Sequence, residues 1–166
     1  MKKIMAKSMF FICSILLGIL VFFNSCGNEK EDSNTPPTST VEEFIAKDAD
    51  FDGFRNWEVV AILDKALSAE GRAHTDAART IWIKPPNTKR GTNGQYPIGT
   101  ILIKEVKGGY GIVAMVKRGG SFNPAHNGWE WFQIDAASKI TSRSASNTCN
   151  NCHSLVKNQD YAFSKN

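Results

Sequence analysis

Five residues near the C-terminus, Cys149-Asn150-Asn151-Cys152-His153, have the C-x-x-C-H spacing that attaches a c-type haem. Each thiol would form a thioether with a haem vinyl group, and the His153 imidazole would bind the iron. On a helix the two cysteines lie about one turn apart, and the histidine follows on the same side. The pattern therefore predicts one covalent haem c with His153 as the proximal ligand.

Two other chemistries are open to these side chains. A Cys-x-x-Cys pair can form a redox-active disulfide, with the histidine incidental to it. A zinc site needs four ligands, and no second pair of cysteines or histidines lies nearby to complete one. Both account for the three residue types less fully than haem attachment does.

The N-terminal segment has the pattern of a bacterial export signal. Three lysines within the first seven residues precede an apolar run over residues 9–23, which ends at Asn24-Ser25-Cys26-Gly27. A cysteine at this boundary resembles a lipobox, in which Cys26 becomes the diacylated first residue of the mature protein. The run is too short to favour a spanning helix, although an uncleaved anchor would tether the domain to the same side. We expect an exported protein, lipid-anchored to a bacterial membrane on its periplasmic or outer-membrane face.

These signals divide the chain into three parts. Residues 1–25 are the predicted lipoprotein signal peptide, and residues 26–40 are polar and read as a flexible tether. Residues 41–166 have the length of one domain, which we expect to carry the haem.

The cysteine count and the net charge argue against a disulfide and against a nucleic-acid partner. Cys13 lies in the signal and Cys26 at the lipid site, so no cysteine beyond the haem pair is left for a disulfide. The whole chain carries a net charge of +4, of which the three signal lysines supply +3. The near-neutral remainder gives no support to nucleic-acid binding.

The apolar pattern within the domain is mostly that of strands. β-Branched and aromatic residues alternate in segments bounded by Gly, Pro or Asn, and Lys107-Gly108-Gly109-Tyr110 has the composition of a hairpin turn. The predicted strands are 57–62, 80–83, 100–106, 111–117 and 129–134. Weaker signals predict helices over 41–47 and 64–70, and a final helix that carries the haem cysteines. We therefore expect an α+β fold, mainly an antiparallel sheet with a few short helices.

A sixth iron ligand would have to come from residues that precede the motif. Only thirteen residues follow His153, and they contain neither Met nor His. Met115 is the sole methionine outside the signal, but a methionine in an apolar strand is usually part of the core. His74 and His126 lie in polar, loop-like stretches typical of the surface.

The ordered combination of several motifs resembles the cytochrome P-460 family, which is related to the cytochromes c-prime beta. The resemblance covers about the last 110 residues. It rests on Arg79-Thr80-Ile81, on Tyr96-Pro97-Ile98-Gly99-Thr100 followed by Ile103-Lys104-Glu105, on Trp129-Glu130-Trp131-Phe132, and on the haem motif with Asp160-Tyr161 beyond it. The resemblance implies a β-rich haem c protein, commonly dimeric, whose iron is held on one side by the histidine of the motif. The best-known members oxidise hydroxylamine, and relatives bind or detoxify nitric oxide.

Catalytic members of that family carry a lysine cross-linked to the haem macrocycle, and Lys104 is the best match. Because strand residues alternate, Lys104 shares a face with Leu102, and it reaches the haem if that face covers it. Otherwise Lys104 is an exposed strand lysine that pairs with Glu105 or another neighbour.

Two further polar residues stand in apolar surroundings. Arg79 could donate a hydrogen bond to a bound nitrogen oxide, and Glu130 could relay protons with a raised pKa. The alternative for each is an ion pair on the sheet surface. The aromatic residues Phe122, Trp129, Trp131 and Phe132 are expected in the core and in the haem-pocket wall.

The favoured function is a membrane-tethered haem protein that binds or oxidises a small nitrogen-oxide or amine ligand and exchanges electrons with a redox partner protein. Hydroxylamine oxidoreductase-like turnover is one form of this function. The alternatives are a six-coordinate electron-transfer cytochrome and a gas-binding or gas-sensing protein without turnover.

Overall fold

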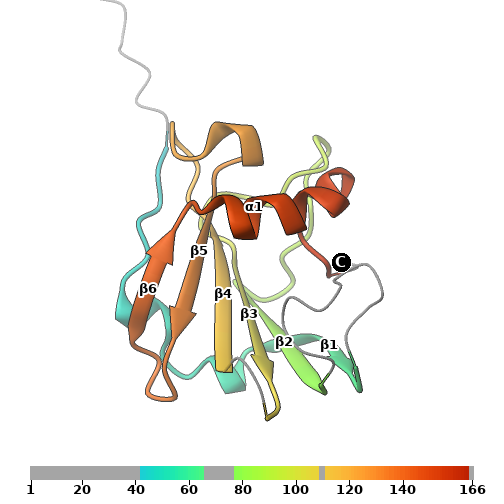
Figure 1. Ribbon diagram of the computed structural model, residues 1–166. Coiled ribbons are helices and arrows are strands. Elements are labelled where there is room, and N and C mark those ends of the chain that lie inside the picture. The colour runs from blue at the N-terminus through green and yellow to red at the C-terminus, as the bar shows by residue number, and fades with distance from the viewer. Residues whose placement is uncertain (1–41, 66–76, 109–110, 165–166) are drawn as a thin grey trace, which may run out of the picture. The chain divides into compact units, whose positions relative to one another are not determined.

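The computed structural model describes residues 42–65, 77–108 and 111–164, which form a six-stranded antiparallel sheet in the order β1-β2-β3-β4-β5-β6 (Figure 1). The strands are β1 (Glu58–Leu63), β2 (Arg79–Lys84), β3 (Ile101–Val106), β4 (Gly111–Lys117), β5 (Trp129–Ile134) and β6 (Ile140–Ser144). Besides the helix α1 (Asn147–His153), these ranges hold the 3-10 turns η1 (Asp48–Phe51), η2 (Phe54–Asn56), η4 (Pro124–His126) and η5 (Ser154–Gln159). The predicted α+β class, with the haem motif on a C-terminal helix, is confirmed.

The first five strands lie within one residue of their predicted bounds. Val106 pairs with Gly111, which confirms the hairpin between β3 and β4, although residues 109–110 lie outside the described chain. Strand β6 was not predicted, because Ile140 is its one large apolar residue. Backbone pairing with β5 holds it in the sheet instead, from Trp131 opposite Ser144 to Ile134 opposite Ile140.

The predicted helix over 41–47 is wrong for its described residues, 42–47. This segment is extended: Glu43 bridges Gly119, and the Phe44 amide donates to the Arg118 carbonyl at 2.8 Å. Backbone pairing with the chain after β4 replaces the intrahelical bonds, and helical geometry begins only at Asp48. The helix predicted over 64–70 falls mostly outside the described residues.

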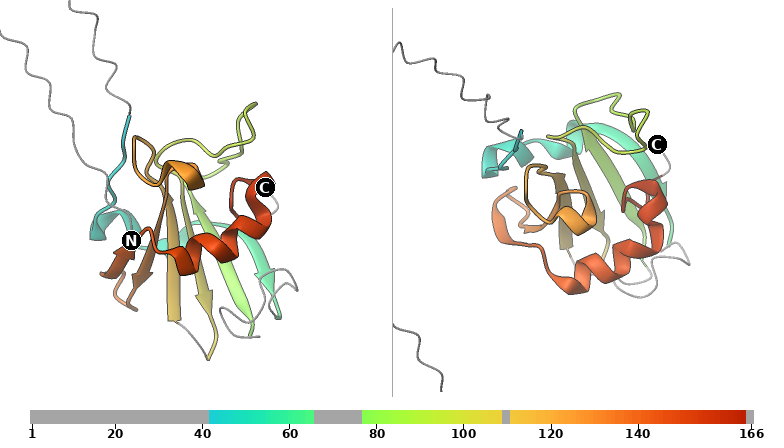
Figure 2. Two further views of the ribbon diagram at one scale, coloured as in Figure 1. Left: turned by 45° about the horizontal axis from the view of Figure 1, so that its top comes forward. Right: turned by 90° about the horizontal axis from the view of Figure 1, so that it is seen from above.

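The two faces of the sheet carry separate apolar clusters because strand side chains alternate. On one face, which we call the opposite face, Phe51 and Phe54 from η1 and η2 pack on Phe132 and Trp82. On the other face, the motif face, Leu102, Met115 and Trp131 lie beneath α1 and the C-terminal residues. Figure 2 shows α1 and the segment with η1 and η2 on opposite sides of the sheet.

The strand register arranges the motif face in rows that run across the sheet. One row reads Ile83, Leu102, Met115, Trp131 and Ser144. The next row reads Ile81, Lys104, Val113, Gln133 and Ser142. These two rows are the surface over which the haem motif lies.

Candidate haem site

Helix α1 carries the whole C-x-x-C-H motif and begins at a capped end. Ser146 is the N-cap, its side chain accepts a bond from the Cys149 amide, and its carbonyl accepts from the Asn150 amide at 3.0 Å. The cap fixes where the helix starts and therefore which side chains face the sheet. Cys149, Cys152 and His153 all line one cavity.

This cavity lies between α1 and the two rows on the motif face and has a volume of about 410 Å³. Most of its wall is apolar, and it includes Leu102, Met115, Trp131 and Phe163. Polar side chains enter it from β3, β5, β6 and the start of α1, namely Lys104, Gln133, Ser142, Ser144, Ser146 and Thr148. An apolar space with a few polar groups is typical of a cofactor or small-molecule site.

The His153 ring is held with one nitrogen committed. Its Nδ1 lies 2.6 Å from the carbonyl oxygen of Tyr161. A carbonyl can only accept, so Nδ1 carries the proton and Nε2 keeps a lone pair for a metal. The ring also packs between Trp131 and Phe163, with centroid distances of 4.3 and 5.1 Å. A metal-bound imidazole usually has its second ring nitrogen held by an acceptor in this way.

The electrostatics of the cavity keep that imidazole neutral. Burial lowers the pKa of His153 to about 4, the bond to Tyr161 opposes the shift, and the positive charge of Lys104 adds to it. Metal binding needs the neutral ring, so His153 is in the required state at neutral pH.

The residues present fit a haem c. Cys149 and Cys152 are both partly exposed, and each borders the apolar cavity. They would form the two thioethers, and His153 would supply the iron ligand from the same helix. The haem itself would contribute the redox chemistry of its iron.

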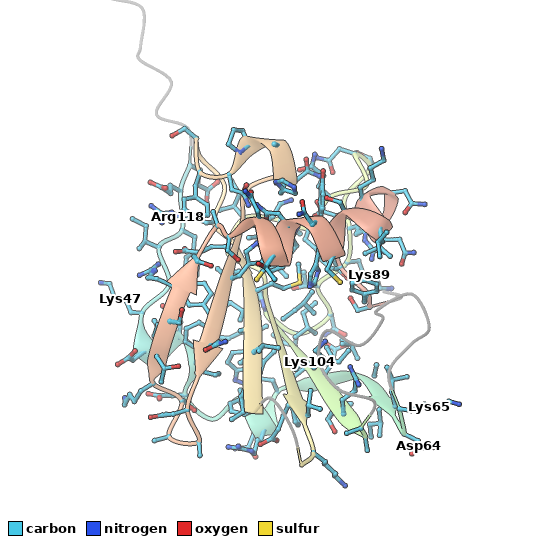
Figure 3. The ribbon with its side chains drawn as sticks, viewed as in Figure 1. Lys47, Asp64, Lys65, Lys89, Lys104 and Arg118 are labelled. Atoms are coloured by element: carbon cyan, nitrogen blue, oxygen red, sulfur yellow. The ribbon has the colours of Figure 1, made fainter. Side chains whose placement is uncertain are left out.

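Lys104 faces the cavity, and its neighbour in sequence faces away. Lys104 lies opposite Ile81 and Val113 on the motif face and lines the cavity. Figure 3 shows it on β3, below α1 in that view. Glu105 instead pairs with Arg55 at 2.6 Å. Glu105 lies opposite Ile112 and therefore belongs to the opposite face of the sheet.

Arg79 and Glu130 are both buried, but the structure places neither in the lining of this cavity. Arg79 lies on the motif face one row beyond Lys104, opposite Val106, and donates to the Ala77 carbonyl at 3.1 and 3.2 Å. Glu130 lies on the opposite face. Its carboxylate bonds Arg143 at 2.8 Å and Arg118 at 3.5 Å, which is an ion-pair arrangement.

Of the candidates for a sixth iron ligand and for lipid attachment, only some lie within the described residues. Met115 lines the cavity, whereas His126 contacts Asn123 and the Tyr161 ring outside it. His74 and Cys26 lie outside the described residues. None of the helices within the described ranges is both long enough and apolar enough to cross a membrane.

Two residues that hold the site were not identified from the sequence. Asn150, in the variable part of the motif, is buried and accepts a bond from the Trp131 indole at 2.8 Å. Its spacing of three residues from His153 was a usable signal, because such residues share a side of a helix. Asp160 is buried among several donors, and no periodic pattern around it indicates that role.

Comparison with known proteins agrees with this geometry. The family model described as Cytochrome P460 matches residues 51–164, which span the sheet, the haem motif and the Tyr161 contact. No curated protein matches the chain significantly. The chain therefore belongs to the Cytochrome P460 family, and it is a haem c protein that acts on nitrogen compounds.

Proposed function

We propose that this chain is an exported, membrane-anchored protein with one covalent haem c, which binds or oxidises hydroxylamine or nitric oxide at an open distal side of the iron. The observation that carries the proposal is a neutral His153, held at Nδ1 by a backbone carbonyl, in one cavity with Cys149, Cys152 and Lys104. The first three groups hold a haem, and the lysine supplies a reactive amine.

Each residue has a distinct part in this proposal. Cys149 and Cys152 fix the cofactor, because each thiol adds across a vinyl group without needing an oxidant. His153 donates its Nε2 lone pair, and the packing of Trp131 and Phe163 keeps the ring oriented. The apolar wall excludes water and favours small ligands with little charge.

The state of Lys104 determines whether the protein only binds the nitrogen compound or also oxidises it. In the catalytic form its Nζ is joined to a carbon of the haem macrocycle. That bond replaces one N–H and one C–H, so a two-electron oxidant such as a peroxide must accept both hydrogens. A redox partner protein would then receive the electrons from the nitrogen substrate.

A second candidate function follows from Met115, which lines the same cavity. If its sulfur binds the iron, the protein is a six-coordinate electron carrier with no open site. Absorption spectra of the purified ferric and ferrous protein test both candidates. The open-site proposal predicts high-spin spectra that change when nitric oxide is added.

The carrier candidate predicts low-spin spectra with the weak red band of methionine-ligated ferric haem, and Met115→Leu would abolish that band. A low-spin spectrum insensitive to nitric oxide would contradict the open-site proposal.

A pyridine haemochrome assay reports whether both thioethers have formed. Light scattering of the same sample tests the dimer that the family resemblance implies.

A further inference from the structure

The turn after the haem motif aims a backbone carbonyl at His153. Asp160 and Tyr161 have φ values of 53° and 61°, so two consecutive non-glycine residues are left-handed. The chain reverses there, and the Tyr161 carbonyl returns to within 2.6 Å of His153 Nδ1. Such backbone conformations persist only where the surrounding structure holds them.

The Asp160 side chain provides that hold. Its buried carboxylate accepts from Lys117 Nζ at 2.8 and 2.9 Å, from the Tyr96 amide at 2.8 Å and from Asn127 Nδ2 at 2.8 Å. The Asp160 carbonyl also accepts from the Trp129 indole at 2.7 Å. These donors come from β4, β5 and the loops before β3 and β5, so the turn is fixed to the sheet at several points.

We propose that Asp160 is a positioning residue for the proximal ligand. By fixing the left-handed turn it keeps the Tyr161 carbonyl on Nδ1 of His153, and it thereby sets how strongly the imidazole donates electrons to the iron. A well-aligned acceptor on Nδ1 raises the basicity of the ligating nitrogen and stabilises ferric haem. This inference rests on the proposed haem site and assigns the control of its potential to a residue outside the cavity.

The test compares two buried carboxylates that both pair with cations. Asp160→Asn keeps the shape of the side chain but removes the charge that faces Lys117. Glu130→Gln does the same on the opposite face, where Arg118 and Arg143 are the partners. Both variants should unfold more easily, and only Asp160→Asn should alter the iron.

For Asp160→Asn we expect a more positive midpoint potential. The ratio of ferric to ferrous protein at a fixed solution potential should fall about tenfold, which corresponds to about 59 mV for one electron. Resonance Raman spectra of the ferrous protein should show a lower iron–histidine stretching frequency. Glu130→Gln should leave both readouts unchanged.

Lys117→Gln is the second variant and removes the ion pair while leaving the Asp160 carboxylate its other donors. It should shift both readouts in the same direction by less, and it keeps the proposal testable if Asp160→Asn does not fold. Unchanged potentials in the Asp160 and Lys117 variants, or an equal shift in Glu130→Gln, would overturn the inference. Absence of covalent haem from the unaltered protein would instead overturn the proposed function.

Discussion

The indole nitrogen of Trp131 lies 2.8 Å from the side-chain oxygen of Asn150. This hydrogen bond joins β5 to the first variable position of the haem motif. Asn150 also accepts from Asn123 at 3.2 Å and donates to the Ala145 carbonyl at 3.1 Å. Because the Trp131 ring packs against His153, Asn150 links the helix to the cavity wall beside the proposed iron ligand.

Asn150→Ala should destabilise the fold. The substitution leaves the buried Trp131 N–H without its acceptor, which costs about 1–3 kcal/mol of the free energy of unfolding. Denaturant unfolding measures the change. Asn151→Ala is the matched control, since Asn151 occupies the neighbouring motif position but is exposed and should cost little. Equal losses in the two variants would contradict the role assigned to Asn150.

His153→Ala should keep the covalent haem but change its spin state, because the thioethers do not depend on the iron ligand. Folding should also be impaired, since the proximal bond is the main link between metal and protein. Absorption spectra and pyridine haemochrome assays measure the two effects. His126→Ala, outside the cavity, should leave the spectrum as it is, and an unaltered spectrum for His153→Ala would show that the ligand is misassigned.

The strand pattern was readable because each main strand alternates β-branched and aromatic residues between turn residues. The same alternation placed Leu102 and Lys104 on one face, but no local pattern says which face a later helix will cover. That choice depends on the pairing of β3 with β2 and β4, which lines Lys104 up with Ile81 and Val113. The pairing register of β3 with its neighbours therefore places Lys104 on the motif face, which strand alternation alone could not predict.

The features that the sequence did not predict also depend on tertiary contacts. Residues 42–47 have a helical composition, but their backbone bonds are satisfied by the chain after β4. Strand β6 is polar because most of its length is exposed. Glu130 stands between two tryptophans in sequence, yet alternation turns it to the opposite face, where two arginines surround it. Apolar neighbours in a strand say little about the surroundings of the residue between them.

Cys26→Ala should release the protein from membranes or leave it unprocessed, because the proposed acyl chains would be attached to that thiol. Detergent phase partitioning and mass spectrometry of the mature amino terminus measure the result. Cys13→Ala is the control, as Cys13 lies within the predicted signal and away from the predicted lipid site. An unmodified amino terminus at another residue, in protein extracted without detergent, would exclude the lipobox.

Lys117 should make the stability depend on pH in the alkaline range. Burial lowers its pKa below the usual 10.5, although its bonds to Asp160 oppose the shift. Between the lowered pKa and 10.5 the unfolded chain binds more protons than the folded one, so the free energy of unfolding rises with pH. Below that window both states are protonated and this contribution is constant.

Urea unfolding at several alkaline pH values, on the unaltered protein and on Lys117→Met, isolates the effect. The free energy of unfolding of the unaltered protein minus that of Lys117→Met should become more positive as the pH rises across the window. Lys107→Met removes a lysine at an exposed position after β3 and is the matched control. A difference that shrinks as the pH rises would mean that the ion pair with Asp160 outweighs burial.

Whether Lys104 is bonded to the haem distinguishes an enzyme from a binding protein. An amine nitrogen bonded to the macrocycle perturbs its electronic structure, so the Soret band of the reduced protein should move well to the red, which thioether linkage alone does not cause. Peptide mapping by mass spectrometry should find Lys104 joined to the haem peptide that contains Cys149 and Cys152. Lys104→Ala should restore an ordinary high-spin c-type spectrum and abolish hydroxylamine oxidation, while Lys107→Ala should alter neither.

If Lys104 carries no bond to the haem in the unaltered protein, the cross-linked, catalytic form of the proposal is excluded. Nitric oxide binding would survive that result, because it requires His153 and an open apolar cavity but no covalent bond to the amine. In that case Lys104 would still act as a fixed positive charge, since it lines the cavity and lowers the pKa of His153. Lys104→Met, which keeps much of the side-chain volume and removes the charge, would then change the affinity for nitric oxide without changing the spin state of the iron.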